Sequence, residues 1–347
     1  MGSDPGRVGP APAPLLQVLP AAGGRPVGRV PSIDAFRGLA VLLMALGNFE
    51  IGVRLFPDWL KHTPDVGYTV ADLVAPMFVV AIGFTVGLSM RRRRSRDGTA
   101  AAAGHLVVRA LALVGIGAVI SAGQALLHPT PGIASTWGVL QCLGVACLLL
   151  LPVVFGPTWV RVAGGLALLV GYQWLLDHYW HDLVLHSAHN GLVGTLSWAG
   201  LLMLATAVGD EYHAAGSPQR PRLLAEVGMA AATIGVGLAP WTPLSKNQAS
   251  ATYMLLSLGL SVLVLAGFDV ALRRHRTRMA WLQSMGHNAL VLYVANLVLL
   301  SVLVLPGVDR WYAGAPLWLT LAQAVVIAGV NVGLATYLDR RGIVVTL

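Results

Sequence analysis

Charged residues are scarce in this sequence. Asp, Glu, Lys and Arg make up 11% of its 347 residues, whereas a soluble globular domain carries about 25%. Hydrophobic residues make up 56% of the chain and the mean hydropathy is +0.71, so the composition indicates a protein of the lipid bilayer. The net charge of +8 does not indicate a nucleic-acid partner, because most basic residues lie in loops between apolar runs, where they orient membrane spans.

Cysteine is nearly absent too, and several catalytic motifs are missing. The two cysteines, Cys142 and Cys147, lie in one apolar run without metal-ligand spacing, so we interpret them as small apolar helix residues. The sequence contains no P-loop, no dinucleotide-binding glycine fingerprint and no G-x-S-x-G elbow. These absences exclude the soluble catalytic folds that carry those motifs.

Apolar runs of about 20 residues, each long enough to cross a bilayer, recur along the chain. They predict an all-α fold, a polytopic membrane helix bundle of about ten transmembrane helices. Residues 1–31, rich in Pro, Gly and Ala, are predicted to be a disordered tail, and residues 32–347 the transmembrane domain. The predicted spans are 34–54, 70–90, 103–127, 136–155, 157–176, 192–209, 221–240, 250–272, 281–305 and 314–338.

The basic residues predict the orientation of these spans. With a cytoplasmic N-terminus, nearly all loop arginines lie inside, including the run "RRRRSR" at 91–96, which we interpret as a stop signal. The basic loop residues that lie outside are Arg54, Lys61, Lys246 and Arg310. This asymmetry predicts that both termini are cytoplasmic and that His62 is extracytoplasmic.

Polar residues in the first three spans are candidates for function, since they are costly in lipid. Asp34 and Arg37 are three residues apart and can pair on one helix face. Asn48 lies about 21 Å further along the helix axis, near His62, where it can bond to a neighbouring helix or hold a reacting carbonyl oxygen. Asp72 opens the second span. Arg109 either extends to the cytoplasmic interface or binds phosphate.

Two later regions add polar candidates. Lys246 precedes the eighth span on the outer side, and Asn288 and Asn296 are eight residues apart, close to one face of the ninth. The loop between the fifth and sixth spans holds His178, His181, His186 and His189. Their spacing matches no strong zinc pattern, so we predict no metal site and interpret them as interfacial residues.

Several segments together resemble the transmembrane acyltransferases related to heparan-α-glucosaminide N-acetyltransferase. The segments are "SIDAFRGLAVLLMALGN", "GYTVADLVAPMFVVAIGFTVGLSM", "WGVLQCLGV" and "GHNALVLYV", in the family's order. "TVADLVxPxF" with an upstream histidine is the specific part, whereas "DxFRG" occurs in wider groups. Three positions depart from the family pattern: Cys142 replaces an arginine, Asn190 replaces an acidic residue, and "PLSKNQA" keeps Lys246 but loses an asparagine and a tryptophan.

The resemblance implies acyl transfer from cytoplasmic acetyl-CoA to a hydroxyl or amine of a sugar or glycoside on the other side of the membrane. His62 falls at the family's catalytic position, as base or acyl carrier, with Asn48 and Asp72 as further catalytic candidates. We expect the acceptor to contact Lys246 and Asn296. The residues expected to bind the donor are Asp34, Arg37, Arg109, Gln141 and Asn288.

Two other functions stay open at this point. Discontinuous helices with Asp, Asn and Pro would also suit a transporter or flippase of a polar or lipid-linked molecule, and an enzyme could move a different acyl group. We expect membrane lipid and the sugar acceptor as partners, no nucleic acid, and leave a homodimer open. The Ala/Gly/Arg-rich composition, with no signal peptide evident, suggests a bacterial plasma membrane.

Overall fold

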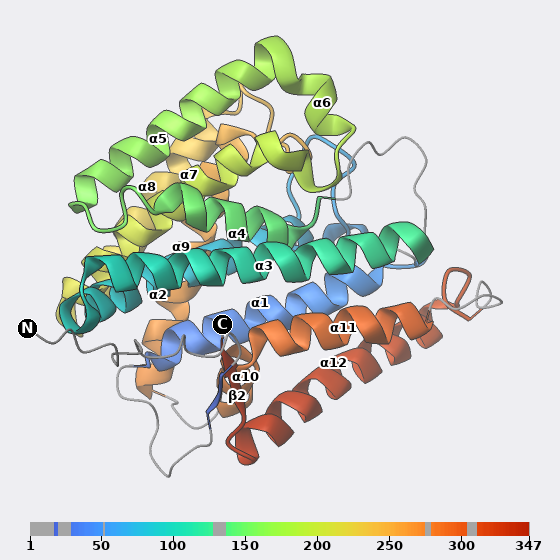
Figure 1. The fold of residues 1–347 in the computed structure, drawn as a ribbon. Helices are drawn as coiled ribbons and strands as arrows, with labels where there is room; N and C mark the ends of the chain where they lie inside the picture. Colours follow the sequence, from blue (N-terminus) through green and yellow to red (C-terminus); the bar gives the residue numbers. More distant parts are fainter. Residues whose placement is uncertain are drawn as a thin grey trace, which may run out of the picture.

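The protein is a bundle of long helices (Figure 1). The computed structural model describes residues 17–19, 29–50, 53–127, 137–274, 279–303 and 311–346. The α-helices are α1 (Pro31–Glu50), α2 (Val70–Asp97), α3 (Thr99–Leu127), α4 (Val139–Leu150), α5 (Thr158–Leu175), α6 (His181–Leu185), α7 (Gly191–Ala214), α8 (Arg220–Leu238), α9 (Ala251–Arg274), α10 (Ala280–His287), α11 (Ala289–Leu303) and α12 (Leu317–Arg340). The predicted all-α fold class is therefore confirmed.

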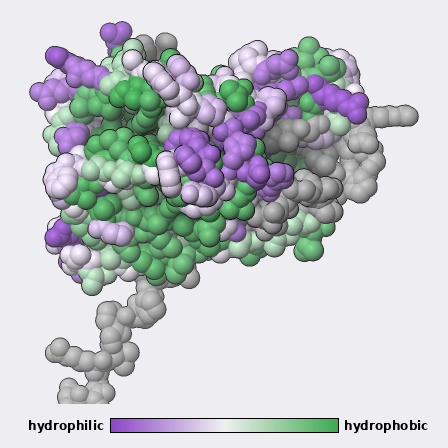
Figure 2. All heavy atoms as spheres, turned by 90° about the horizontal axis from the view of Figure 1, so that it is seen from above, coloured by the Kyte–Doolittle hydropathy of each residue, from purple (hydrophilic) through white to green (hydrophobic). Residues whose placement is uncertain are grey.

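Every predicted span overlaps at least one of these helices. Within the described ranges, eight helices are long and apolar enough to cross a membrane, or up to nine if the bent pair α10–α11 counts as one span. Their lipid-facing character is visible at the surface, where hydrophobic residues form broad areas on the side of α5 (Figure 2). Exposed Trp159, Val170 and Trp174 belong to that helix. A polytopic bundle accounts for the apolar composition.

The fourth predicted span, 136–155, is shorter than expected. Its helix α4 covers Val139–Leu150, which is 12 residues and about 18 Å of helix, against about 30 Å of hydrocarbon core. Pro152 follows the C-cap residue Leu151, and proline cannot continue the backbone hydrogen-bond ladder. Apolar composition alone did not reveal this early end.

The ninth predicted span is broken. Helices α10 and α11 meet at an angle of 84°, with Asn288 between them as the C-cap of α10. The Asn288 amide nitrogen donates to the Ile343 carbonyl at 2.9 Å, and its oxygen accepts from the Val345 amide at 2.9 Å. Asn288 therefore ties the bend to the C-terminal segment.

Helix α2 lies in the middle of the bundle, in contact with α1, α3, α7 and α9. On the other side of α1, two glycines allow a close approach of α10. A side chain on Gly38 would collide with the Leu282 carbonyl, and one on Gly286 with the Asp34 carbonyl. The first turns of α1 are thus held directly against α10.

The two ends of the described chain meet in a short antiparallel ladder. Strand β1 (Gln17–Leu19) pairs with β2 (Val344–Thr346), so both lie at the same end of the bundle. The cytoplasmic location of both termini stays a prediction. The division at residue 31 stays a prediction, and Arg310 and most of the tail lie outside the described residues.

Candidate active site

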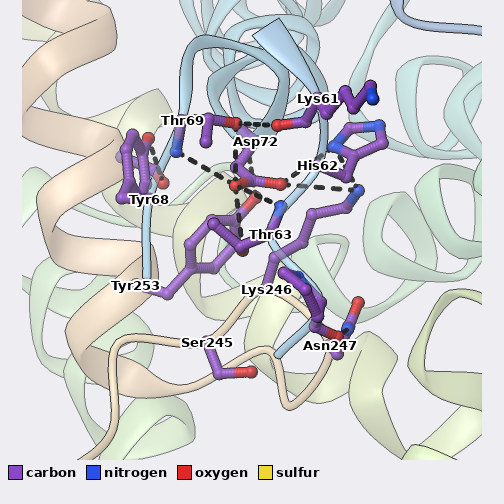
Figure 3. A network of polar contacts seen from close by, with 12 residues as sticks. Lys61, His62, Thr63, Tyr68, Thr69, Asp72, Ser245, Lys246, Asn247 and Tyr253 are labelled. Carbon is purple, nitrogen blue, oxygen red and sulfur yellow. Dashed lines mark hydrogen bonds and ion pairs between the residues drawn. The ribbon is translucent and has the colours of Figure 1, made fainter. Parts of the chain in front are cut away.

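Asp72 is held at the start of α2 by the sequence that caps this helix. Thr69 is the N-cap and Asp72 the N3 residue of a capping box, in which the Thr69 amide donates to Asp72 Oδ2 at 3.1 Å. Thr63 Oγ1 donates to the same oxygen at 3.1 Å. The carboxylate is fully buried, and these donors offset the loss of water. Oδ1 is left to face the neighbouring loops (Figure 3).

His62 lies against that second oxygen. Its Nδ1 is 2.9 Å from Asp72 Oδ1, and its backbone amide donates to Glu50 Oε1 at 3.3 Å. When Nδ1 donates to this carboxylate, which only accepts hydrogen bonds, the imidazole proton is on Nδ1 and the lone pair on Nε2. This is the tautomer that a general base needs.

Lys246 completes the group. Its Nζ lies 2.9 Å from His62 Nδ1 and 3.8 Å from Asp72 Oδ1. Burial lowers the pKa of the ammonium group below its ordinary value, although the nearby carboxylates of Asp72 and Glu50 act in the opposite direction. His62 Nδ1 can donate to Asp72 or accept from the Lys246 ammonium group, but not both at once, because an ammonium group only donates. In the tautomer that donates to Asp72, the Lys246 charge is available to a negative group in the cavity.

Asp65 fastens the Lys246 loop to the His62 loop. Its Oδ1 accepts from Ser245 Oγ at 2.7 Å and from Gln248 Nε2 at 3.2 Å. The Gly67 amide also donates to the Leu244 carbonyl at 2.8 Å. These contacts hold Lys246 beside His62.

A cavity of about 910 Å³ connects this group to the opposite end of the bundle. It runs beside α1 from Asn48 to Asp34, a length of about 21 Å. His62, Lys246 and His189 line it near Asn48. Six arginines line it as well, most of them near the N-terminus of α1 and the C-terminus of α2: Arg29, Arg37, Arg92, Arg93, Arg96 and Arg109.

Most of the predicted site residues meet at this cavity. Asn48, His62 and Lys246 line the end near α2's N-terminus, and Asp72 stands behind His62. Asn48 makes no side-chain hydrogen bond to any residue in the described ranges, so its amide is free to bind a ligand. At the arginine end, Arg37 donates to the Gly286 carbonyl at 3.3 Å and lies 3.7 Å from Asp34.

Three other predicted residues lie apart from the cavity lining, as far as the chain is described. Gln141 Oε1 caps α4, accepting from the Gly138 amide at 2.5 Å and from Ser121 at 3.0 Å. Asn288 is occupied by the C-terminal segment. Asn296 is buried and faces Asn331 across 3.5 Å between α11 and α12. Each of these side chains is engaged in contacts within the protein.

Further residues that were not assigned to a site from the sequence line the cavity: Arg92, Arg93 and Arg96, together with His189, His213 and His287. The "RRRRSR" run divides by helix face. Arg91 pairs with buried Asp210, which also binds Arg161. Arg92, Arg93 and Arg96 line the cavity, and Arg96 also donates two hydrogen bonds to Asp97. Helical spacing places Arg92 and Arg96 on one face of the helix, but the sequence does not tell what that face meets.

Comparisons with known proteins show the family of this chain. The family model described as "Heparan-alpha-glucosaminide N-acetyltransferase, catalytic" matches residues 29–212, which is more than half of the chain. Heparan-alpha-glucosaminide N-acetyltransferase of Mus musculus and that of Homo sapiens are each 36% identical to it over 124 residues, covering 34% of this chain. The aligned region spans only 18% of the length of each relative. With its apolar helices, this multi-pass membrane protein belongs to the family of heparan-alpha-glucosaminide N-acetyltransferase catalytic domains.

Proposed function

We propose that the protein is an integral-membrane acetyltransferase that moves an acetyl group from acetyl-CoA to a hydroxyl or amine of a sugar or glycoside. The observation that carries this proposal is the single cavity with arginines at one end and the His62–Asp72 pair at the other. Its volume of about 910 Å³ lies at the upper end of the range typical of ligand pockets, about 300–1,000 Å³.

The arginine end suits the nucleotide part of the donor. CoA carries phosphate groups, and guanidinium groups bind phosphate through paired hydrogen bonds. The positive-inside rule assigns this end to the cytoplasm, where acetyl-CoA is made, and His62 to the other side. We propose a bacterial plasma membrane as the location. The pantetheine arm would extend past the apolar middle of the cavity, beside Phe78 and Leu113.

The histidine end supplies the chemistry. His62 Nε2 takes the proton from the acceptor group, whose oxygen or nitrogen forms a bond to the thioester carbonyl carbon. The tetrahedral intermediate then collapses, the carbon–sulfur bond breaks, and the CoA thiolate receives the proton from His62. Asp72 holds the imidazole in the required tautomer and stabilises its positive charge while the proton is there.

Asn48 and Lys246 are the candidates for stabilising the oxyanion, since both line the cavity beside His62. One good donor to an oxyanion contributes about 3 kcal/mol to transition-state stability. His62 Nε2 is also placed to accept the acetyl group itself in a two-step route. Acetylated protein formed without acceptor, detected by mass spectrometry, would identify that route.

We expect the His62→Ala variant to lose at least about a hundredfold in acetyl transfer, because it removes the base. Purified protein in nanodiscs would be assayed for CoA thiol release with a panel of amino sugars and hydroxylated glycosides. His181→Ala, a substitution of an exposed histidine outside the cavity, should keep the wild-type rate. Equal rates for both variants would contradict the assignment. Acceptor-dependent thiol release by the wild type also separates an enzyme from a transporter.

A further inference from the structure

A second, smaller cavity lies beside the histidine end. Its volume is about 250 Å³, below the range of about 300–1,000 Å³ typical of pockets for drug-sized ligands. It therefore has room for one ring rather than for an oligosaccharide. The apolar part of its wall includes Val79, Val139, Cys142 and Leu143, and the polar part consists of Ser187, His189, Asn190, Lys246 and Asn247.

This side pocket adjoins the main cavity. Lys246 and His189 line both, as do Val139 and Leu143 of α4. Lys246 Nζ is 2.9 Å from the ring of His62. A small molecule in the side pocket that touches Lys246 is therefore next to the imidazole that would act as base.

The polar wall is built on an unusual backbone turn before α7. His189 and Asn190 have φ values of 49° and 68°, a left-handed conformation that is costly for residues other than glycine. The Asn190 amide offsets this cost by donating to the Lys246 and Asn247 carbonyls at 3.0 and 2.7 Å, while its oxygen accepts from Trp198 at 3.1 Å. The turn thus joins the α7 end to the Lys246 loop.

The same turn directs the His189 ring. Its Nδ1 lies 3.0 Å from the Trp137 carbonyl, which only accepts, so the neutral ring carries its proton there and its lone pair on Nε2. His189 thereby presents a hydrogen-bond acceptor, and Lys246 a donor, at the boundary between the two cavities. A hydroxyl group satisfies both partners, because it donates and accepts.

The charge of the residues that line the side pocket favours a neutral ligand over a cationic one. None of the residues lining the side pocket, all within the described chain, carries a carboxylate, whereas Lys246 carries an ammonium group. A cationic amino sugar would meet no carboxylate in the pocket wall and would lie beside the Lys246 ammonium group, which already has Asp72 as its counter-charge at 3.8 Å. A second cation there is unfavourable in a confined site. A neutral hydroxylated ring meets neither penalty.

We propose that the side pocket is the acceptor subsite and that it takes a single neutral hydroxylated ring, such as one sugar unit, so that the acetyl group is delivered to oxygen. This inference rests on the proposed acetyltransferase function and specifies its acceptor. The acceptor hydroxyl loses its proton to His62 Nε2, its oxygen forms the ester bond to the acetyl carbon, and CoA leaves as the thiol after taking that proton.

The test uses the purified full chain in nanodiscs with acetyl-CoA and two matched probes, methyl α-glucopyranoside and methyl α-glucosaminide. Both probes are assayed below and above the pKa of the amino sugar, because only the unprotonated amine has the lone pair that attacks the thioester. We expect a higher kcat/KM for the neutral glycoside, with an ester product by mass spectrometry. A higher kcat/KM for the amino sugar would overturn the proposed ligand class.

The position of the subsite is tested by a pair of matched variants on α4. Cys142→Leu enlarges a side chain that lines the side pocket, whereas Cys147→Leu makes the same change at a buried position outside both cavities. We expect Cys142→Leu to raise the KM for the glycoside at least about tenfold without changing the KM for acetyl-CoA, and Cys147→Leu to change neither. Equal acceptor KM values in the two variants would overturn the position. If no acceptor caused thiol release by wild-type protein, the proposed function itself would fail, and the subsite with it.

Discussion

Lys246 places an ammonium group in a buried position beside an imidazole and a carboxylate. Because burial lowers its pKa below the ordinary value of 10.5, the folded protein binds this proton less tightly than the unfolded chain does. Between the lowered pKa and the ordinary one, the unfolded state therefore binds more protons, and this residue's contribution to stability rises with pH. In the folded protein its charge, which we propose stabilises the oxyanion, is lost as the pH rises through the lowered pKa.

We therefore expect an alkaline decline in kcat/KM that belongs to Lys246. An arginine at this position stays charged at all working pH values, so Lys246→Arg should move the decline to higher pH while lowering the maximal rate through its different shape. The measurement is a pH profile of acetyl transfer. Lys61→Arg, a change in the neighbouring loop but outside the cavity lining, should leave the profile unchanged. An identical alkaline decline in wild type and Lys246→Arg would refute the assignment.

Among the helices, the contact between α1 and α10 sets one end of the cavity. Gly38 and Gly286 let the two backbones touch, and Arg37 bonds to the Gly286 carbonyl at 3.3 Å. In this way α10 fixes the first turns of α1, which carry two of the residues that line the arginine end, Asp34 and Arg37.

We expect Gly286→Leu to separate these helices. The added side chain meets the Asp34 carbonyl, and overpacking of this kind costs about 1–3 kcal/mol. A lower midpoint of thermal unfolding and a smaller stabilising shift on adding acetyl-CoA should both be seen. The control is Gly329→Leu on α12, where a side chain meets no neighbour among the described residues. Equal losses in the two variants would argue against a special role of the α1–α10 contact.

The helices themselves could be predicted from hydropathy, but the interruptions could not. The bend at Asn288 depends on bonds to Ile343 and Val345, which are distant in sequence and leave no local pattern. Asn288 and Asn296 were predicted to bind ligands because polar residues are costly in lipid. The same cost is offset when the asparagine bonds to another part of the protein, so the sequence does not distinguish a bound ligand from an internal hydrogen-bond partner.

In the candidate site, too, some residues could be predicted from the sequence and others could not. The position of His62 before "TVADLV" led to the histidine and Asp72, because that motif combines a helix cap with the group that orients the imidazole. The roles of Arg92, Arg93 and Arg96 could not be assigned, since a basic run after a span looks alike whether it faces lipid headgroups or a cavity. Asp65 acquired its role through contacts with a loop about 180 residues away.

For the whole molecule, the arginines concentrate positive charge at one end of the cavity. We expect replacement of Arg92, Arg93 and Arg96 by glutamine to raise the KM for acetyl-CoA about a hundredfold or more, since each hydrogen bond to a charged group contributes about 1.5–3 kcal/mol. The KM for the acceptor should change little. Raising the salt concentration should raise the wild-type KM for acetyl-CoA in the same direction.

The control for this change replaces three arginines outside the cavity lining, Arg222, Arg340 and Arg341, by glutamine. It removes the same charge, so any effect on membrane insertion would appear in both proteins. The assignment of the arginine end to the donor would be abandoned if the two triple variants showed the same KM for acetyl-CoA.

The cavity that joins the arginine end to His62 has an electrical consequence. In the proposed reaction the phosphates of the donor stay among the arginines, and the acetyl group that continues toward His62 carries no charge. Moving one elementary charge through the membrane potential involves about 2.3 kcal/mol per 100 mV, whereas a neutral group involves none. The protein would thus move an acetyl group from one compartment to the other, and neither the membrane potential nor an ion gradient would have to supply free energy for that step.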